Sequence, residues 1–384
     1  MRVRGETLTS LFICGDILNE YNDQEICDQN LKEIIKRSDY AICNFEAPIE
    51  GFGSKIQKSG IHLRQKRETV EILKNTGFNL LCLSNNHIMD YGKEALNDTI
   101  NEIKENNLEY IGAGMDFKSA YKPLIKQIDN IKLGIINCCE AQFGVLDNKS
   151  NKTDAGYAWI NHRLICQTIL NLKEECDCVI LLAHAGLEDV SIPQIEWREK
   201  YKLFCDLGVD IVVGSHPHVP QGYEKYNNSY IFYSLGNFYF DDTENHLAKR
   251  DSSFSLLIQI DDKKVSGIDF VYHYTEINKV RLATKDEVDI EELNNLLGQG
   301  YEYLHKKISN EAYANILTVT KLFSKTTNVN LKNFIKNNNF IRSMFKKDKI
   351  DKKVTNMHYL RNESYYYVIK NVLIDRIYNK TTGR

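Results

Sequence analysis

Residues 210–241 read DIVVGSHPHVPQGYEKYNNSYIFYSLGNFYFD and carry the clearest signal of the fold. Two apolar runs, 210–213 and 230–234, have the length and composition of buried strands, and each stops abruptly at a polar cluster. The first cluster contains His216 and His218, and the second ends on Asn237. In open α/β sheets, ligands bind outside the carboxyl ends of the strands. This stretch therefore predicts a ligand site at one edge of a sheet.

The rest of the first 275 residues repeats this pattern. Seven further apolar runs predict strands at 11–15, 40–45, 79–83, 132–137, 178–183, 252–260 and 264–274. Four segments with helical spacing of apolar residues predict helices at 66–76, 93–106, 161–175 and 193–207. Alternation of strands and helices indicates an α/β architecture. The last two strands are separated by a short polar stretch, which predicts a hairpin.

Polar residues follow several of the other predicted strands. They are Asp16 after LFI, Glu46 after YAIC, Asn86 and His87 after LLCL, and His184 after CVILLA. If the strands share one sheet edge, these side chains meet those of His216 and His218. Two carboxylates, one amide oxygen and three imidazoles form a mixed oxygen and nitrogen set. Such a set suits Mn²⁺, Fe²⁺ or Zn²⁺ better than Mg²⁺ or Ca²⁺, which prefer oxygen ligands alone.

Asp16 allows an alternative interpretation. Asp16 is also suited to cap a helix that begins at Ile17, although the preceding strand and Gly15 favour a ligand. His216 and His218 stand two residues apart, so their side chains share one side of the chain if that segment is extended.

The ordered motifs resemble those of one known family. They are GD (15–16), NFE (44–46), NNHIMDYG (85–92), HAGLE (184–188), GSHPHVPQGYE (214–224) and SLGNFYFD (234–241). Together they resemble the CapA-like capsule (poly-γ-glutamate) biosynthesis proteins, from about residue 9 to 275. Those proteins are similar to the calcineurin-like metallophosphatases. The resemblance implies a metallophosphatase-like four-layer αββα sandwich that binds one or two divalent transition metal ions (Mn, Fe or Zn).

The resemblance also implies roles for individual residues. It makes ligands of Asp16, Glu46 (in the place of the bridging aspartate), Asn86, His184, His216 and His218. It places His87 over the substrate as an acid–base group, with Asp90 to orient its ring. Glu188 and Asn237 are expected to support the ligands or contact the substrate, and Arg64 is a candidate clamp for an anion. Leu18 stands where the metallophosphatases have a histidine, so the metal nearest Asp16 and His218 is expected to bind weakly or not at all.

The function implied by the resemblance is a metal-dependent, phosphoesterase-like hydrolase in the biosynthesis of a capsule or another surface polymer. The alternative is a non-catalytic assembly or polyanion-binding factor that retains the fold and the crevice. Leu18 and Glu46 favour the alternative, whereas His87 and Asp90 favour catalysis, because binding alone requires no acid–base group. The expected substrate is an anionic small molecule or polymer.

The composition changes near residues 278–285. We predict a CapA-like domain over 1–280 and a basic α-helical C-terminal extension over 281–384, which begins with a helix at 286–307. Residues 311–384 contain 15 Lys and Arg against 5 Asp and Glu, a net charge of +10, in a chain with a net charge of −3. This segment is expected to contact an anionic polymer or membrane surface. Binding that does not weaken with salt would contradict that expectation. No specific nucleic-acid binding is expected.

The cysteines and the N-terminus bear on the compartment. Most of the ten cysteines lie inside apolar runs, which indicates reduced core residues and not a disulfide framework. The first residues lack the long apolar stretch and cleavage site of a signal peptide, and no run of about 18 apolar residues occurs. We therefore expect a cytoplasmic protein.

Overall fold

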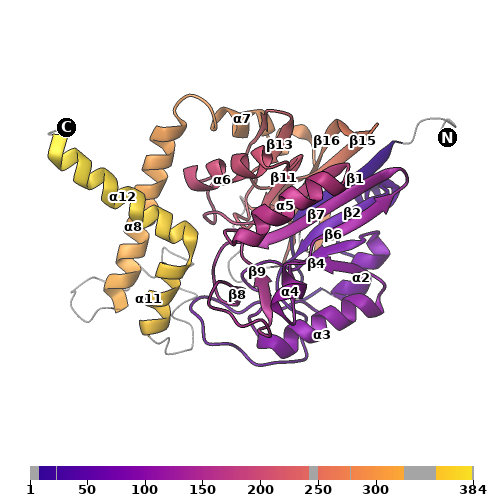
Figure 1. Ribbon diagram of the computed structural model, residues 1–384, viewed down its shortest axis with the longest axis horizontal. Coiled ribbons are helices and arrows are strands. Elements are labelled where there is room, and N and C mark those ends of the chain that lie inside the picture. The colour runs from indigo at the N-terminus through magenta and orange to yellow at the C-terminus, as the bar shows by residue number, and fades with distance from the viewer. Residues whose placement is uncertain (1–7, 23, 242–249, 277, 324–351, 383–384) are drawn as a thin grey trace.

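The computed structural model describes residues 8–22, 24–241, 250–276, 278–323 and 352–382. Two large β-sheets lie face to face, and helices cover the outer face of each (Figure 1). Three apolar cores separate these four layers, one between the sheets and one under each helical layer. The predicted α/β fold, a four-layer αββα sandwich, is confirmed.

The first sheet contains eight strands. They are bonded in the order β17 (Lys279–Leu282), β16 (Lys264–Glu276), β15 (Ser252–Asp261), β1 (Thr9–Leu18), β2 (Tyr40–Phe45), β3 (Leu80–Cys82) and β4 (Glu109–Ile111), and β14 (Asn237–Phe240) also pairs with β1. Strands β1 to β4 run parallel, and β15 and β16 form the predicted hairpin. The outer face is covered by α1 (Gln29–Arg37), α2 (Thr69–Thr76) and α3 (Gly92–Glu105).

The second sheet contains six strands. They are bonded in the order β12 (Tyr223–Tyr226), β13 (Ser229–Phe232), β11 (Ile211–Ser215), β10 (Cys178–His184), β7 (Ile131–Cys139) and β6 (Leu124–Ile128). Helices α5 (Arg163–Glu175) and α6 (Ile195–Asp206) pack on its outer face. Strands β7, β10, β11 and β13 run parallel, so their carboxyl ends lie at one edge.

Alternation along the central strands explains why the sheets stack. In β1, Leu11 and Ile13 enter the core between the sheets, whereas Phe12 and Cys14 enter the core under the helices. Every residue of β10 is buried, as expected for a parallel strand with both faces covered. Burial on both faces makes such strands continuously apolar, and the polar residues gather where the strands end.

The sequence predicted most of the long elements, but it missed the nine-residue helix α1 and the strands β4, β6, β12, β14 and β17. All nine predicted strands and all four predicted helices of the first 275 residues are present. A small sheet of β5 (Ala113–Gly114), β9 (Gly156–Ala158) and β8 (Val145–Leu146), and the one-turn helix α4 (Phe117–Ala120), were not predicted. Elements of two to four residues are too short to show a periodic pattern.

The predicted helix at 286–307 is wrong as a single helix. A 3₁₀ turn (Lys285–Glu287) and α7 (Ile290–Asn295) end before Gly300, whose φ of +95° breaks the helix, and α8 (Tyr301–Phe323) begins after it. Helices α11 (Lys352–Arg361) and α12 (Glu363–Thr382) lie beside α8 to one side of the sandwich (Figure 1). The predicted helical extension is therefore present, apart from residues 324–351, which lie outside the described residues.

The division at residues 280 and 281 stays a prediction, because β17 of the first sheet runs across it. Among the described helices, none combines the length and the apolarity that a membrane crossing requires.

Candidate metal centre

The carboxyl ends of strands from both sheets meet at one place. In the first sheet, Asp16 of β1 lies beside Asn44 of β2, and Glu46 follows directly after β2. In the second sheet, His184 at the end of β10 lies beside Ser215 at the end of β11. This placement follows the general rule for ligand sites in open α/β sheets.

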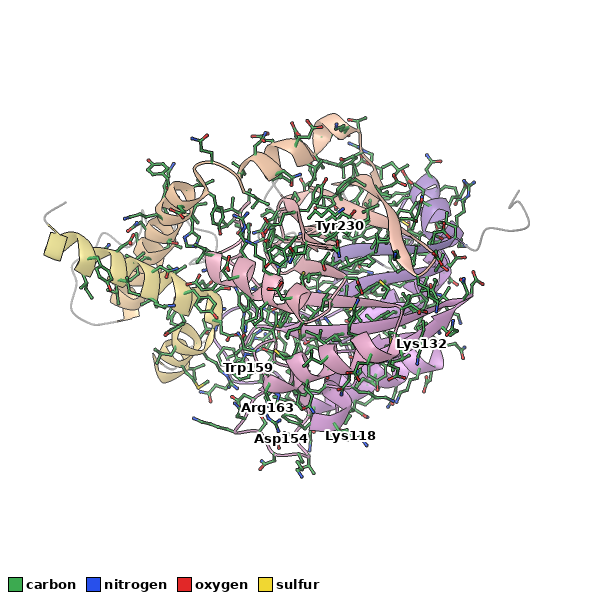
Figure 2. All side chains as sticks on the ribbon, turned by 45° about the horizontal axis from the view of Figure 1, so that its top comes forward. Lys118, Lys132, Asp154, Trp159, Arg163 and Tyr230 are labelled. Carbon is green, nitrogen blue, oxygen red and sulfur yellow. The ribbon has the colours of Figure 1, made fainter. Side chains whose placement is uncertain are left out.

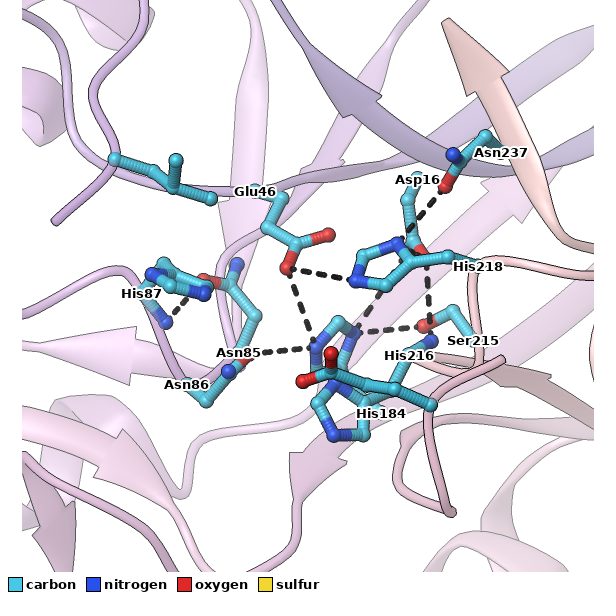
Figure 3. A network of polar contacts seen from close by, with 12 residues as sticks. Asp16, Glu46, Asn85, Asn86, His87, His184, Ser215, His216, His218 and Asn237 are labelled. Carbon is cyan, nitrogen blue, oxygen red and sulfur yellow. Dashed lines mark hydrogen bonds and ion pairs between the residues drawn. The ribbon is translucent and has the colours of Figure 1, made fainter. Parts of the chain in front are cut away.

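The six predicted ligands form one buried cluster (Figure 3). Nε2 of His184 lies 2.9 Å from Oδ1 of Asn86 and 3.8 Å from Oε1 of Glu46. Nε2 of His218 lies 3.9 Å from the same Glu46 oxygen, and its Nδ1 lies 3.5 Å from Oδ2 of Asp16. The ring of His216 lies 4.6 Å from that of His184, measured between centroids. Residues far apart in the sequence thus converge on a single point.

Several buried polar atoms in this cluster have no hydrogen-bond partner. They are both carboxylate oxygens of Glu46 and Nδ1 of His216. Buried polar atoms are almost always paired, because an unpaired one costs about 1–3 kcal/mol. Three sets of ligand atoms lie within 4.8 Å of one another, namely Glu46 with His184 and His216, Asp16 with Glu46 and His218, and Glu188 with His216 and His218. The donor set therefore fits a divalent transition metal ion.

Glu188 lies close enough to the ligand cluster to be a metal ligand itself. The sequence suggested a supporting or substrate contact, whereas the structure places a carboxylate oxygen within ligand range of His216 and His218. Glu188 is the fourth residue after the end of β10, on the loop that also carries Gly186.

Neighbouring polar groups hold the ligands in place. Nδ2 of Asn44 donates to Asp16 at 2.8 Å, and the backbone N–H of His216 donates to the same carboxylate at 3.1 Å. Nδ1 of His218 donates to Oδ1 of Asn237 at 2.9 Å, which leaves Nε2 of that ring for a metal. Asn237 was expected as a supporting or substrate contact, and the structure places it against His218.

Burial shifts the ligands toward their uncharged forms. It raises the pKa of Asp16 to about 7, although hydrogen bonds from His216 and Asn44 act in the opposite direction. Burial, followed by the charge of Asp16, raises the pKa of Glu46 well above its usual range. Burial also lowers the pKa of His216 to about 3. A divalent cation would compensate the carboxylate charges and requires neutral imidazoles, so these shifts agree with a metal site.

The segment that carries the two histidines is not extended. Strand β11 ends at Ser215, and φ is +94° at His216 and +60° at His218, on either side of Pro217. The expectation of an extended segment was wrong, and the interpretation of Asp16 as a helix cap was also wrong, because it lies within β1. Positive φ is uncommon outside glycine and is concentrated at functional sites. Here it turns both rings toward the cluster.

His87 stands beside the cluster in a network of its own. Its Nδ1 lies 2.7 Å from Oδ2 of Asp90 and 3.2 Å from Nζ of Lys58, which also pairs with Oδ1 of Asp90. Burial and then the charge of Lys58 lower the pKa of His87. The structure thus places Asp90 where it orients the ring, as expected. Lys58 was missed, because it lies in an irregular segment without periodicity.

The predicted anion clamp lies elsewhere. The side chain of Arg64 is 54% exposed, and its ion pair, at 4.0 Å, is with Glu50. A different arginine lies near the ligands: Arg250 donates to both oxygens of Asp189 at 2.8 and 2.9 Å and lies 4.0 Å from Glu188. After burial, the charge of Arg250 has the largest effect on His218 and lowers its pKa.

A cavity of about 590 Å³ begins beside Glu188. One wall is the loop after β10, which includes Ile192, and the other is α8, which contributes Ile308 and Ala312. Tyr365 of α12 completes the lining. The cavity is mostly apolar, and Glu188 in its lining is also within ligand range of His216 and His218.

Comparisons with known proteins support the resemblance to the capsule biosynthesis proteins. Residues 10–242 match the family model described as bacterial capsule synthesis protein PGA_cap. The chain is 34% identical over 233 residues to the capsule biosynthesis protein CapA of Bacillus anthracis, which covers 59% of this chain and 56% of that protein. It is 32% identical over 271 residues to the PGA biosynthesis protein CapA of Bacillus subtilis, which covers 67% of this chain and 69% of that protein. The chain thus spans little more than half of the first relative.

Among solved structures, the 5'-nucleotidase of Candida albicans SC5314 is 14% identical to this chain. The similarity covers 70% of this chain and 52% of the nucleotidase, with a TM-score of 0.40.

Proposed function

Because the chain belongs to the bacterial capsule synthesis protein family PGA_cap, we propose that it acts in the biosynthesis of a capsule or another surface polymer. In that role we propose that it is a metal-dependent hydrolase of the phosphoesterase type. One observation carries the chemical part of the proposal: buried ligand atoms of Glu46 and His216 without hydrogen-bond partners converge with those of Asp16, His184 and His218. Such an arrangement is costly unless a cation compensates it.

The residues divide between metal binding and proton transfer. Asp16, Glu46, Asn86, His184, His216 and His218 hold one or two ions of Mn, Fe or Zn, with Glu188 in reach of them. When bound, such an ion supplies Lewis-acid stabilisation of an anionic substrate. Asp90 and Lys58 occupy Nδ1 of His87, so Nε2 is the atom that exchanges a proton with the substrate.

The substitution His87→Gln tests the catalytic part of the proposal. Purified chain loaded with Mn²⁺, Fe²⁺ or Zn²⁺ is expected to hydrolyse phosphoesters such as p-nitrophenyl phosphate. The variant should lose about 10²–10⁴-fold in kcat, because general acid–base catalysis contributes that much. Its metal content should stay that of the unaltered chain. His305→Gln on α8, outside the cluster, is the matched control.

The outcome also decides between catalysis and the alternative, a non-catalytic assembly or polyanion-binding factor. Leu18 favours that alternative, because it is buried among Ala47 and Leu63 and supplies no ligand. A chain that retains its metal, yet hydrolyses no phosphoester and gains no defect from His87→Gln, would contradict the hydrolase and support the alternative.

The cavity beside Glu188 is proposed to hold the part of the substrate beyond the reacting group. Ala312→Trp would fill it from α8. We expect KM to rise about tenfold, with kcat and metal content unchanged, because the lost contacts are equal in ground and transition states. Asn310→Trp places the same side chain at an exposed position of the same helix and should leave KM unaltered. Equal KM values in both variants would place the substrate elsewhere.

A further inference from the structure

A buried carboxylate that the proposed mechanism does not use lies directly behind the metal cluster. Glu140 follows the last residue of β7, Cys139, which pairs in register with His184 of β10. The backbone N–H of Glu140 donates to the carbonyl oxygen of His184 at 3.0 Å, and its side chain is completely buried. Glu140 thus occupies the same strand-end position as the ligands, one strand further along the sheet.

Its two carboxylate oxygens face different partners. Oε1 lies 3.6 Å from Nε2 of His216 and accepts a hydrogen bond from Gln142 at 2.8 Å. Oε2 accepts a hydrogen bond from the hydroxyl of Ser364, the second residue of α12. Nε2 of Gln142 also lies 3.4 Å from Nε2 of His216. The acceptor oxygen of Glu140 beside Nε2 favours the ring tautomer with its proton there, and Nδ1, which has no hydrogen-bond partner, then keeps its lone pair for a metal.

The start of α12 is fixed to the sandwich by several further hydrogen bonds. The carboxylate of Glu363 accepts from the backbone N–H of Ala141 at 2.8 Å, from Nε1 of Trp159 at 3.1 Å and from Nδ2 of Asn161 at 2.8 Å. Figure 2 shows Trp159 close to the C-terminal helices. Ser364 in turn accepts from Nε1 of Trp197 at 3.0 Å. Polar contacts of this density position a side chain more tightly than apolar packing alone.

We infer that Glu140, which accepts a hydrogen bond from Ser364 at the start of α12, is a positioning residue for His216, so that helix α12 is a structural part of the metal centre. This inference rests on the proposed metal site. The family model ends at residue 242, and therefore the match does not include this helix. The predicted appendage beyond residue 281 thus contributes to the site through Ser364.

The metal dissociation constant of the whole chain tests this inference. Glu140→Gln and Ser364→Ala should raise the Kd for Zn²⁺ about 10–100-fold, as loss of such a partner to a ligating histidine does. Ser364→Thr keeps the hydroxyl and should restore most of the affinity. Trp197→Phe is the matched control, because it removes the other hydrogen bond to the Ser364 hydroxyl and leaves Glu140 paired. Its Kd should change less than about threefold.

Two further measurements separate positioning from general stability. The absorption spectrum of the Co²⁺-loaded chain reports ligand geometry, and it should change in Glu140→Gln and stay the same in Trp197→Phe. The melting temperature of the metal-free chain measures stability alone. Unchanged Kd and spectrum in Glu140→Gln, or a Kd in Trp197→Phe that rises as much as in Ser364→Ala, would overturn the inference. Failure of the unaltered chain to bind any metal would instead overturn the proposed function.

Discussion

Alanine at both His216 and His218 is expected to abolish metal binding. Mass spectrometry of the purified, metal-reconstituted chain should find about one or two transition metal ions per chain, and less than about a tenth of that in the double variant. Each of the three sets of ligand atoms in the cluster contains His216, His218 or both, so the double substitution removes a ligand from every set. No single remaining carboxylate or imidazole replaces two lost ligands. Addition of a chelator should lower the melting temperature of the unaltered chain and leave that of the double variant unaffected.

The matched control removes two histidines that lie outside the cluster. His62→Ala/His305→Ala changes the same number of imidazoles, and both of these residues are only partly buried. This variant should keep its full metal content. An unaltered chain that stays free of metal after reconstitution with Mn²⁺, Fe²⁺ and Zn²⁺ would contradict the proposed site, as would undiminished metal in the double variant.

Of the substitutions proposed for this chain, Lys58→Met is expected to lower the free energy of unfolding most. The side chains of Lys58 and Asp90 are only 4% and 0% exposed, and they form an ion pair. Removing one partner of a buried ion pair costs about 3–5 kcal/mol, because the other charge stays buried without compensation. We expect a loss near the lower end of this range of energies, because Asp90 also accepts a hydrogen bond from the N–H of Leu63 at 2.8 Å and contacts His87. Urea unfolding of the metal-free chain measures this loss.

A double-mutant cycle tests the explanation. Asp90→Asn keeps the acceptor for Leu63 and removes the charge. Lys58→Met combined with Asp90→Asn should therefore be more stable than Lys58→Met alone, with a coupling energy of about 2 kcal/mol. If the two changes in the free energy of unfolding simply add, the coupling energy is zero and the ion pair does not explain the loss.

Ligands of open α/β sheets bind outside the carboxyl ends of the strands, and this generalisation explains why much of the site could be predicted. Glu46 follows β2, His184 ends β10, and Asp16 lies near the end of β1, and the apolar run of each strand is plain in the sequence. The same rule applies to Glu140 after β7, and it would have identified this residue had the strand been extended to Cys139. The predicted strand stopped at the polar residue Asn137, whereas β7 continues through Cys138 and Cys139.

Other residues of the site carry no comparable signal. Lys58 and Arg250 lie in irregular segments, and only the folded chain shows that both are mostly buried. By contrast, Arg64, which is only six positions from Lys58 in the sequence, is exposed and pairs with Glu50. A lysine in a loop is usually solvated, so its burial depends on tertiary packing that composition does not reveal. The break at Gly300 is a similar case, because glycine near a helical pattern is often tolerated.

The contact between Glu140 and Ser364 also bears on protein synthesis. Asp16 and Ser364 are 348 positions apart, and at about 5–20 residues per second the ribosome needs roughly 20–70 s to pass from one to the other. Throughout that interval the nascent chain lacks the hydroxyl that holds Glu140, and after His218 it carries all the carboxylates and imidazoles of the cluster without that hydroxyl. We therefore expect the metal to be acquired after translation of α12, by a chain that already has both sheets, and not during elongation.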